Sequence, residues 1–190
     1  MKNEEWSLIS IILTDNVQAM KPKIEDGFLE QTTFNKLQNF LMSNRFDWHY
    51  SDTIDFSDDG SNKFQFTHIF YVDPIPRSSY FENLVPILEI IKPISIVRIK
   101  ANLLTKTLNI IENIFHGDME DMLEEKQKQW TTSILYINTN DGYTKFEGGT
   151  KVESVANRMI TFPADMKHTG ATCTDEKSRV VINFNYIDSK

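Results

Sequence analysis

Short runs in which apolar and polar residues alternate fill most of residues 94–187, and this pattern predicts half-buried strands. Turn signals such as NTNDG, EGG and PADMK separate the runs. About eight short strands in about 95 residues are typical of a jelly roll or a barrel. The predicted strands cover residues 95–103, 109–116, 131–139, 143–148, 151–154, 158–163, 167–173 and 178–187.

The pattern changes before residue 93, where helices and strands alternate. Phe34, Leu37, Phe40 and Leu41 recur at helical spacing, with Thr32 or Thr33 as the expected N-cap. Pro86 lies inside the second predicted helix and should kink or split it. The helices are expected at residues 32–46 and 78–93, and the strands at residues 7–13 and 63–73.

The chain therefore predicts a mostly β fold with flanking helices and a double-stranded β-helix core of the jelly-roll, cupin-like type. We expect a single domain over residues 1–190, because the sequence contains no repeat or linker. Residues 1–93 would form an α/β support region and residues 94–187 the core. Residues 117–130 form a charged insertion that is too long for a hairpin turn, and we expect a lid there.

Composition narrows the possible partners. The net charge of −7 disfavours a general affinity for nucleic acid. A single cysteine, Cys173, excludes an intramolecular disulfide and a multi-cysteine metal site. No apolar run reaches the roughly 20 residues of a membrane helix. We expect a cytoplasmic protein that acts on a small molecule or a peptide.

Candidate chemistry begins at His116 and Asp118. Residues two apart on a strand point to the same face, so both side chains can reach one metal ion. Two histidines and one carboxylate are the ligand set of non-haem iron(II) oxygenases. His168 opens a predicted strand of the β-rich half, outside which His49 and His68 lie, and is therefore the best third ligand. Taken alone, the two-residue pattern is more often a polar turn.

Arg179 opens the last predicted strand and shares a face with Val181, Asn183 and Asn185. Its planar guanidinium suits the carboxylate of a bound 2-oxo acid, although an exposed sheet edge would also suit it. Asn102 and Tyr136 are weaker candidates for contacts with the same ligand, and a structural role remains open for each.

The order of these residues, together with RIKANL, FHGD and the run from SILYINTNDGYTKFEGG to RVVINFNY, resembles the iron(II)- and 2-oxoglutarate-dependent oxygenases. The resemblance is to the prolyl-hydroxylase-like branch and its small phage-type members. It implies that His116, Asp118 and His168 bind Fe(II) and that Arg179 binds the distal carboxylate of 2-oxoglutarate. With dioxygen as the other co-substrate, the chain would hydroxylate an unidentified substrate, such as a peptidyl proline, and release succinate and CO2.

Two alternatives remain open at this point. A cupin-like metal-binding protein or metalloenzyme would keep the metal site without using 2-oxoglutarate. A non-catalytic binding module would keep the fold and produce no succinate.

Overall fold

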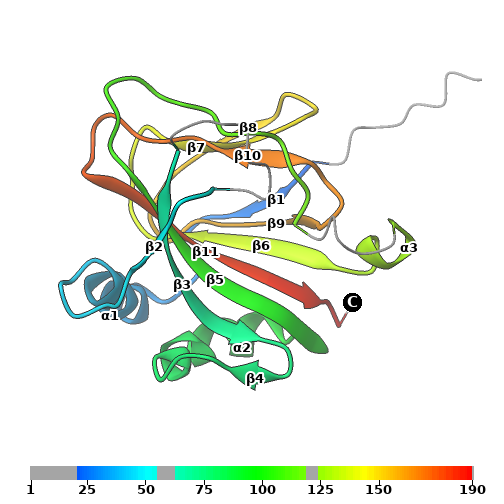
Figure 1. Cartoon of the computed structure of the whole chain (residues 1–190). Helices are drawn as coiled ribbons and strands as arrows, with labels where there is room; N and C mark the ends of the chain where they lie inside the picture. The colour runs from blue at the N-terminus through cyan, green and yellow to red at the C-terminus, as the bar shows by residue number, and fades with distance from the viewer. Residues whose placement is uncertain (1–20, 55–62, 119–123, 190) are drawn as a thin grey trace, which may run out of the picture.

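The computed structural model describes residues 21–54, 63–118 and 124–189, and within them the chain forms two facing antiparallel sheets. Figure 1 shows the smaller sheet lying across one face of the larger one. The larger sheet has the order β1 (Lys23–Glu25), β9 (Met159–Pro163), β6 (Thr131–Tyr136), β11 (Ser178–Ile187), β5 (Ser95–Thr105), β3 (Gln65–Val72) and β2 (His49–Ser51), with β4 (Ile75–Pro76) paired to β3. The smaller sheet has the order β10 (His168–Gly170), β7 (Tyr143–Phe146) and β8 (Lys151–Glu153).

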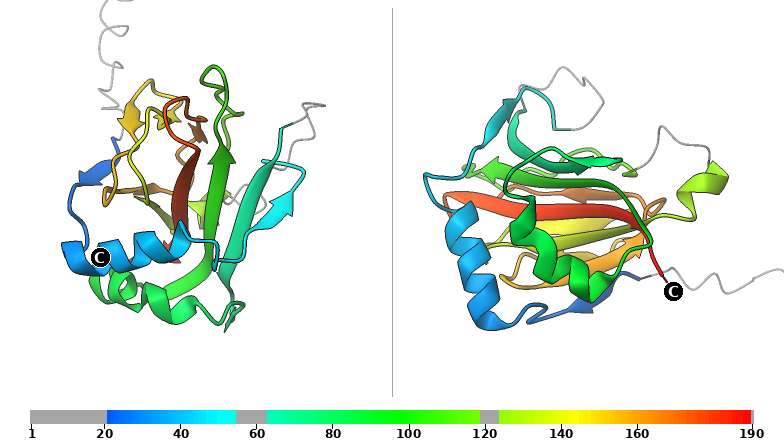
Figure 2. Two further views of the ribbon diagram at one scale, coloured as in Figure 1. Left: turned by 90° about the vertical axis from the view of Figure 1, so that its left-hand side faces the viewer. Right: turned by 90° about the horizontal axis from the view of Figure 1, so that it is seen from below.

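Helices cover the other face of the larger sheet. Figure 2 shows α1 (Gln31–Leu41) and α2 (Val85–Ile91) packed side by side against it. A 3-10 turn, η1 (Phe81–Leu84), leads into α2, and a short α3 (Glu124–Gln127) lies apart from this layer. The predicted mostly β fold with flanking helices is confirmed.

The alternation along β11 separates two cores. Val180, Ile182 and Phe184 face the helices and belong to the larger core. Val181 faces the smaller sheet and packs in a second core with Tyr136. The two faces match the division predicted from the sequence, and the second core leaves room for polar side chains between the sheets.

Helix boundaries differ from the prediction for local reasons. Glu30, not Thr32 or Thr33, caps α1, because its carboxylate accepts hydrogen bonds from both threonine amides at 2.9 and 3.0 Å. Pro86 lies in the first turn of α2, where its missing N–H costs nothing. The predicted second helix is therefore split, with the 3-10 turn before the proline.

The predicted strand at residues 109–116 is wrong. This segment makes only two isolated bridges, Glu112 with Ala171 and His116 with His168, instead of a continuous ladder. The predicted strand at residues 7–13 lies outside the described residues, as does the 119–123 part of the predicted lid. Within the ranges that the structure covers, no helix is long and apolar enough to cross a membrane.

Strands from the predicted support region extend the core sheet directly. β3 pairs with β5, and β1 pairs with β9. The larger sheet thus carries residues of both halves of the chain behind the face on which the candidate site lies.

Candidate metal centre and adjoining cavity

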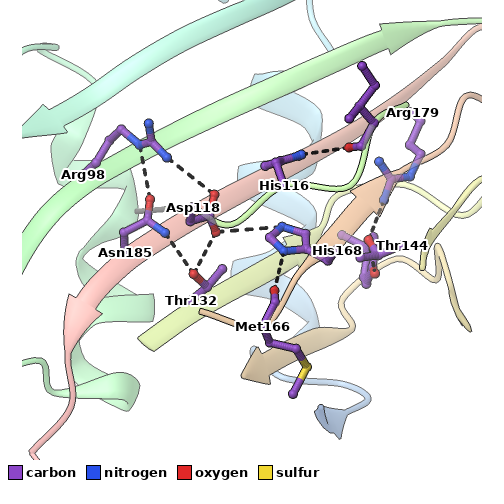
Figure 3. Close-up of polar contacts among 11 residues, drawn as sticks. Arg98, His116, Asp118, Thr132, Thr144, Met166, His168, Arg179 and Asn185 are labelled. Carbon is purple, nitrogen blue, oxygen red and sulfur yellow. Dashed lines mark hydrogen bonds and ion pairs between the residues drawn. The ribbon is translucent and has the colours of Figure 1, made fainter. Parts of the chain in front are cut away.

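His116 and His168 lie directly opposite each other in the bridge, and each amide donates to the carbonyl of the other at 3.0 Å. Asp118 follows His116 by two residues, in the turn at the end of the same segment. The candidate ligand atoms of the three side chains all lie within 4.8 Å of one another. In Figure 3 these side chains converge, as a shared metal ion requires.

Backbone carbonyls orient both imidazoles. His116 Nδ1 lies 3.1 Å from the Ile114 carbonyl, and His168 Nδ1 lies 3.1 Å from the Met166 carbonyl. A carbonyl oxygen only accepts, so Nδ1 carries the proton in each ring. The lone pair of each Nε2 is then free for a metal, which is the usual arrangement around a ligating histidine.

A closed ring of polar contacts holds Asp118. Thr132 donates to Asp118 Oδ2 at 2.7 Å, and Asn185 Nδ2 donates to Thr132 at 3.1 Å. Arg98 Nε donates to Asn185 Oδ1 at 3.2 Å, and its Nη2 lies 3.5 Å from Asp118 Oδ1. The register places Asn185 opposite both Arg98 and Thr132, so three adjacent strands fix the carboxylate (Figure 3).

The protonation states suit metal binding. Burial opposes ionisation of Asp118, but His168 in its protonated form, the charge of Arg98 and the Thr132 hydrogen bond hold the pKa of this carboxyl below its ordinary value. Burial also lowers the pKa of His168, although Asp118 opposes that shift. An ionised carboxylate and a neutral imidazole are therefore favoured near pH 7, and these are the forms that ligate metals.

The three candidate ligands lie on the wall of a cavity of about 100 Å³ between the two sheets. Its floor is the inner face of β5, β11 and β6, and its roof contains residues 113–118 and β10. Between its two ends the lining contains the apolar Ile134 and Val181 beside the polar Lys100, Asn102 and Asn183. The charged residues of the lining are Arg98, Lys100, Asp118 and Arg179.

Arg179 is 4% exposed and reaches across to the smaller sheet. Its Nε donates to Ser154 Oγ at 2.8 Å, and its Nη2 donates to Thr144 Oγ1 at 3.0 Å. Tyr136 donates to the same Thr144 oxygen at 2.8 Å, so the Thr144 hydroxyl proton remains available for a ligand in the cavity.

Two glycines make room for the Arg179 side chain. A Cβ at Gly142 would lie 2.7 Å from Arg179 Cδ, and a Cβ at Gly170 would lie 3.3 Å from Arg179 Nη1. Within the described ranges, Nη1 has no hydrogen-bond acceptor and faces the cavity wall beside Gly170. A guanidinium with one free edge next to a free hydroxyl is a ready site for a carboxylate.

Of the two weaker candidates for contacts with the 2-oxo acid, Asn102 and Tyr136, the structure places only Asn102 on the cavity wall. Asn102 lines the cavity floor, opposite Val181 in the register. Tyr136 is fully buried behind Thr144 and does not line the cavity. Sequence reasoning missed Thr132, Thr144 and Ser154, because hydroxyl residues are common in strands and only cross-strand register shows what they contact.

No protein-family model and no curated protein sequence matches the chain. Solved structures with a similar fold do match the chain. The epimerase SnoN, in complex with Fe3+, alpha ketoglutarate and nogalamycin RO, is similar with a TM-score of 0.63 and 11% identity, over 88% of this chain and 79% of that one. An oxidoreductase of the 2OG-Fe(II) oxygenase family from Burkholderia pseudomallei is similar with a TM-score of 0.61 and 10% identity, over 90% and 86%.

A prolyl hydroxylase from Trichoplax adhaerens, in complex with a peptide fragment of the hypoxia inducible factor oxygen degradation domain, is also similar. Its TM-score is 0.61 at 13% identity, over 90% of this chain and 85% of that one. The chain therefore has the fold of the 2OG-Fe(II) oxygenases, and the predicted double-stranded β-helix core is confirmed.

Proposed function

We propose that the chain is an iron(II)- and 2-oxoglutarate-dependent dioxygenase that hydroxylates a small molecule or a peptide side chain. One observation carries the proposal. A His-Asp-His set lies at one end of a single cavity, and a buried arginine with a free Nη1 lies at the other. A metal and a dicarboxylate are the ligands that these two ends would bind.

Each residue has a role in this scheme. His116, Asp118 and His168 would hold Fe(II), which when bound supplies the redox chemistry that couples oxidative decarboxylation of 2-oxoglutarate to substrate hydroxylation. Arg179 and Thr144 would bind the distal carboxylate, and Ile134 and Val181 would exclude water beside the methylene carbons. Succinate and CO2 would be the co-products.

The similar structures support the proposed metal and 2-oxo acid ligands more strongly than they support the proposed hydroxylation. SnoN is described with Fe3+ and alpha ketoglutarate, which are the two ligand types that the cavity fits. An epimerase and a prolyl hydroxylase share the fold, so the fold does not determine the reaction. Hydroxylation is therefore our proposal and does not follow from the structural similarity.

The test uses purified protein with Fe(II) and 2-oxoglutarate under anaerobic conditions. We expect a visible metal-to-ligand charge-transfer band in the wild type and none in His116→Ala. Arg179→Ala should weaken 2-oxoglutarate binding at least tenfold while Co(II) still binds, and exposed Arg77→Ala is the matched control. No band in the wild type would refute the proposal. Metal binding without a band would favour a cupin-like metalloenzyme, and a band and turnover unaffected by Arg179→Ala would refute the role proposed for Arg179.

A further inference from the structure

The inner face of β5 presents two cations side by side to the cavity. Arg98, Lys100, Asn102 and Leu104 all line it, and neighbours on one strand face are about 7 Å apart. Arg98 is already engaged by Asp118 and Asn185. Lys100 comes next along the strand, one step towards the Arg179 end.

Lys100 lacks a direct partner among the described residues. In the part of the chain that the structure describes, its ammonium makes no hydrogen bond and no ion pair. Burial and the charge of Arg98 lower its pKa to about 8, although the charge of Asp118 opposes the shift, so most Lys100 side chains remain protonated at pH 7. Lys100 is only partly exposed, and an ammonium that loses much of its hydration without a direct partner is costly. This cost indicates that a group outside the chain neutralises it.

The charge of the whole cavity leads to the same conclusion. Arg98, Lys100 and Arg179 oppose the single carboxylate of Asp118, so the lining carries an excess of two positive charges when the histidines are neutral. A divalent metal and a doubly charged 2-oxo acid cancel each other. The excess therefore persists in the loaded site, and a further anion would balance it.

An unpartnered acceptor lies beside Lys100. Asn183 is its register partner on β11, and the buried Asn183 Oδ1 has no hydrogen-bond donor in the described ranges. Asn113 Oδ1, on the roof, is also unpartnered, and that residue is 8% exposed. Both oxygens would be satisfied by a ligand that carries an N–H or O–H group.

Lys100 and Asn183 lie at a different level of the sheet from Arg179. Leu104, not Lys100, is the register partner of Arg179, and Lys100 lies two same-face positions away from Leu104, about 14 Å along the strand. The backbone positions of Lys100 and Arg179 are therefore well separated along the sheet, so the two cations can bind different anionic groups.

We propose that Lys100 binds an anionic group, a carboxylate or a phosphate, of the primary substrate, and that Asn183 accepts a hydrogen bond from a neighbouring N–H or O–H group. The proposal rests on the proposed oxygenase function and narrows its substrate. A small acid, such as a free amino acid or a phosphate monoester, fits the cavity floor, whereas a neutral side chain in the middle of a peptide does not.

The test compares matched probes on wild-type protein loaded with Fe(II) and 2-oxoglutarate. The panel contains amino and hydroxy acids with their amides, and phosphate monoesters with their parent alcohols. Binding is measured by anaerobic calorimetry, and stimulation of 2-oxoglutarate decarboxylation by succinate release. The variants are Lys100→Met, Lys100→Arg and the control Lys106→Met, a nearby exposed lysine.

We expect anionic members to bind at least tenfold more tightly than their neutral partners. Lys100→Met should remove that preference, Lys100→Arg should retain most of it, and the 2-oxoglutarate charge-transfer titration should stay within about twofold in both. Equal binding of neutral partners, or no binding by any anionic member, overturns the proposal. A large loss of 2-oxoglutarate affinity in Lys100→Met also overturns it, because Lys100 would then bind the co-substrate. Failure of the oxygenase function is distinct, since wild type would show no charge-transfer band.

Discussion

His116 and His168 exchange two backbone hydrogen bonds of 3.0 Å across an isolated bridge, although many strands separate them in the sequence. The bridge joins the segment before Asp118 to β10 of the smaller sheet. If the two rings hold one metal ion, metal affinity and local backbone structure should be coupled, because a ligand that holds both rings also holds the bridge closed.

A bound metal should accordingly stabilise the protein against unfolding. At a free concentration of 100 times the dissociation constant, one site adds about 2.7 kcal/mol to the free energy of unfolding. We expect Co(II) or anaerobic Fe(II) to raise the melting temperature of the wild type. The melting temperature of His116→Ala should not respond, and a response equal to the wild type would show that the metal binds elsewhere.

Thr132→Val should weaken metal binding without unfolding the protein. Thr132 donates the 2.7 Å hydrogen bond to Asp118 Oδ2, and valine keeps the shape but not the hydroxyl. Losing such an orienting contact typically lowers metal affinity 10- to 100-fold. Calorimetric titration with Co(II) measures the change, and Thr131→Val on the same strand is the control. Equal affinities for the two variants would contradict the role of the ring around Asp118.

Gly170→Ala should weaken 2-oxoglutarate binding at the Arg179 end of the cavity. The new Cβ would lie 3.3 Å from Arg179 Nη1, on the edge that we assign to the co-substrate carboxylate. We expect the dissociation constant of 2-oxoglutarate to rise roughly tenfold, while Co(II) affinity is unchanged. Gly148→Ala, where a Cβ meets nothing within 4 Å, is the control. A parallel loss of metal affinity would instead indicate a general disturbance of β10.

The proposed ligand set could be selected from the sequence because its residues follow one order along the chain, and the structure brings the three side chains together. The reason given for His116 and Asp118, a shared strand face, was wrong, since residues 109–116 form only isolated bridges. The isoleucines of that predicted strand, Ile110, Ile111 and Ile114, are 37–41% exposed. Apolar alternation indicates a strand only where a partner strand completes the ladder.

The supporting residues could not be predicted in the same way. Thr132 contacts Asp118, and Thr144 contacts Arg179, through pairings between strands that are distant in sequence. A shift of one residue in either strand would turn those hydroxyls to the other face. Lys100 shows the same limit, because alternation places it on a strand face but does not show that it lacks a direct partner among the described residues.

His68, which is not part of the candidate metal site, should make the free energy of unfolding depend on pH. It is 5% exposed, its Nδ1 lies 2.7 Å from the Asp47 carbonyl, and its Nε2 lies 2.8 Å from Ser78 Oγ. Burial lowers its pKa below the ordinary 6.5, although the Asp47 contacts oppose the shift. A histidine whose folded-state pKa is depressed takes up its proton more readily in the unfolded state. Its contribution to stability is therefore present above pH 6.5 and is lost as the pH falls towards the folded-state pKa.

The measurement is urea unfolding of metal-free wild type and His68→Gln at pH 7.5, 6.5 and 5.5. Below pH 6.5 the wild type should lose stability more steeply than the variant, and the difference for this one group is at most about 1.4 kcal/mol per pH unit. The comparison isolates His68, because His168 titrates in both proteins. Parallel curves for the two proteins would show that His68 accepts a proton equally in the folded and unfolded states, contrary to its burial against Asp47 and Ser78.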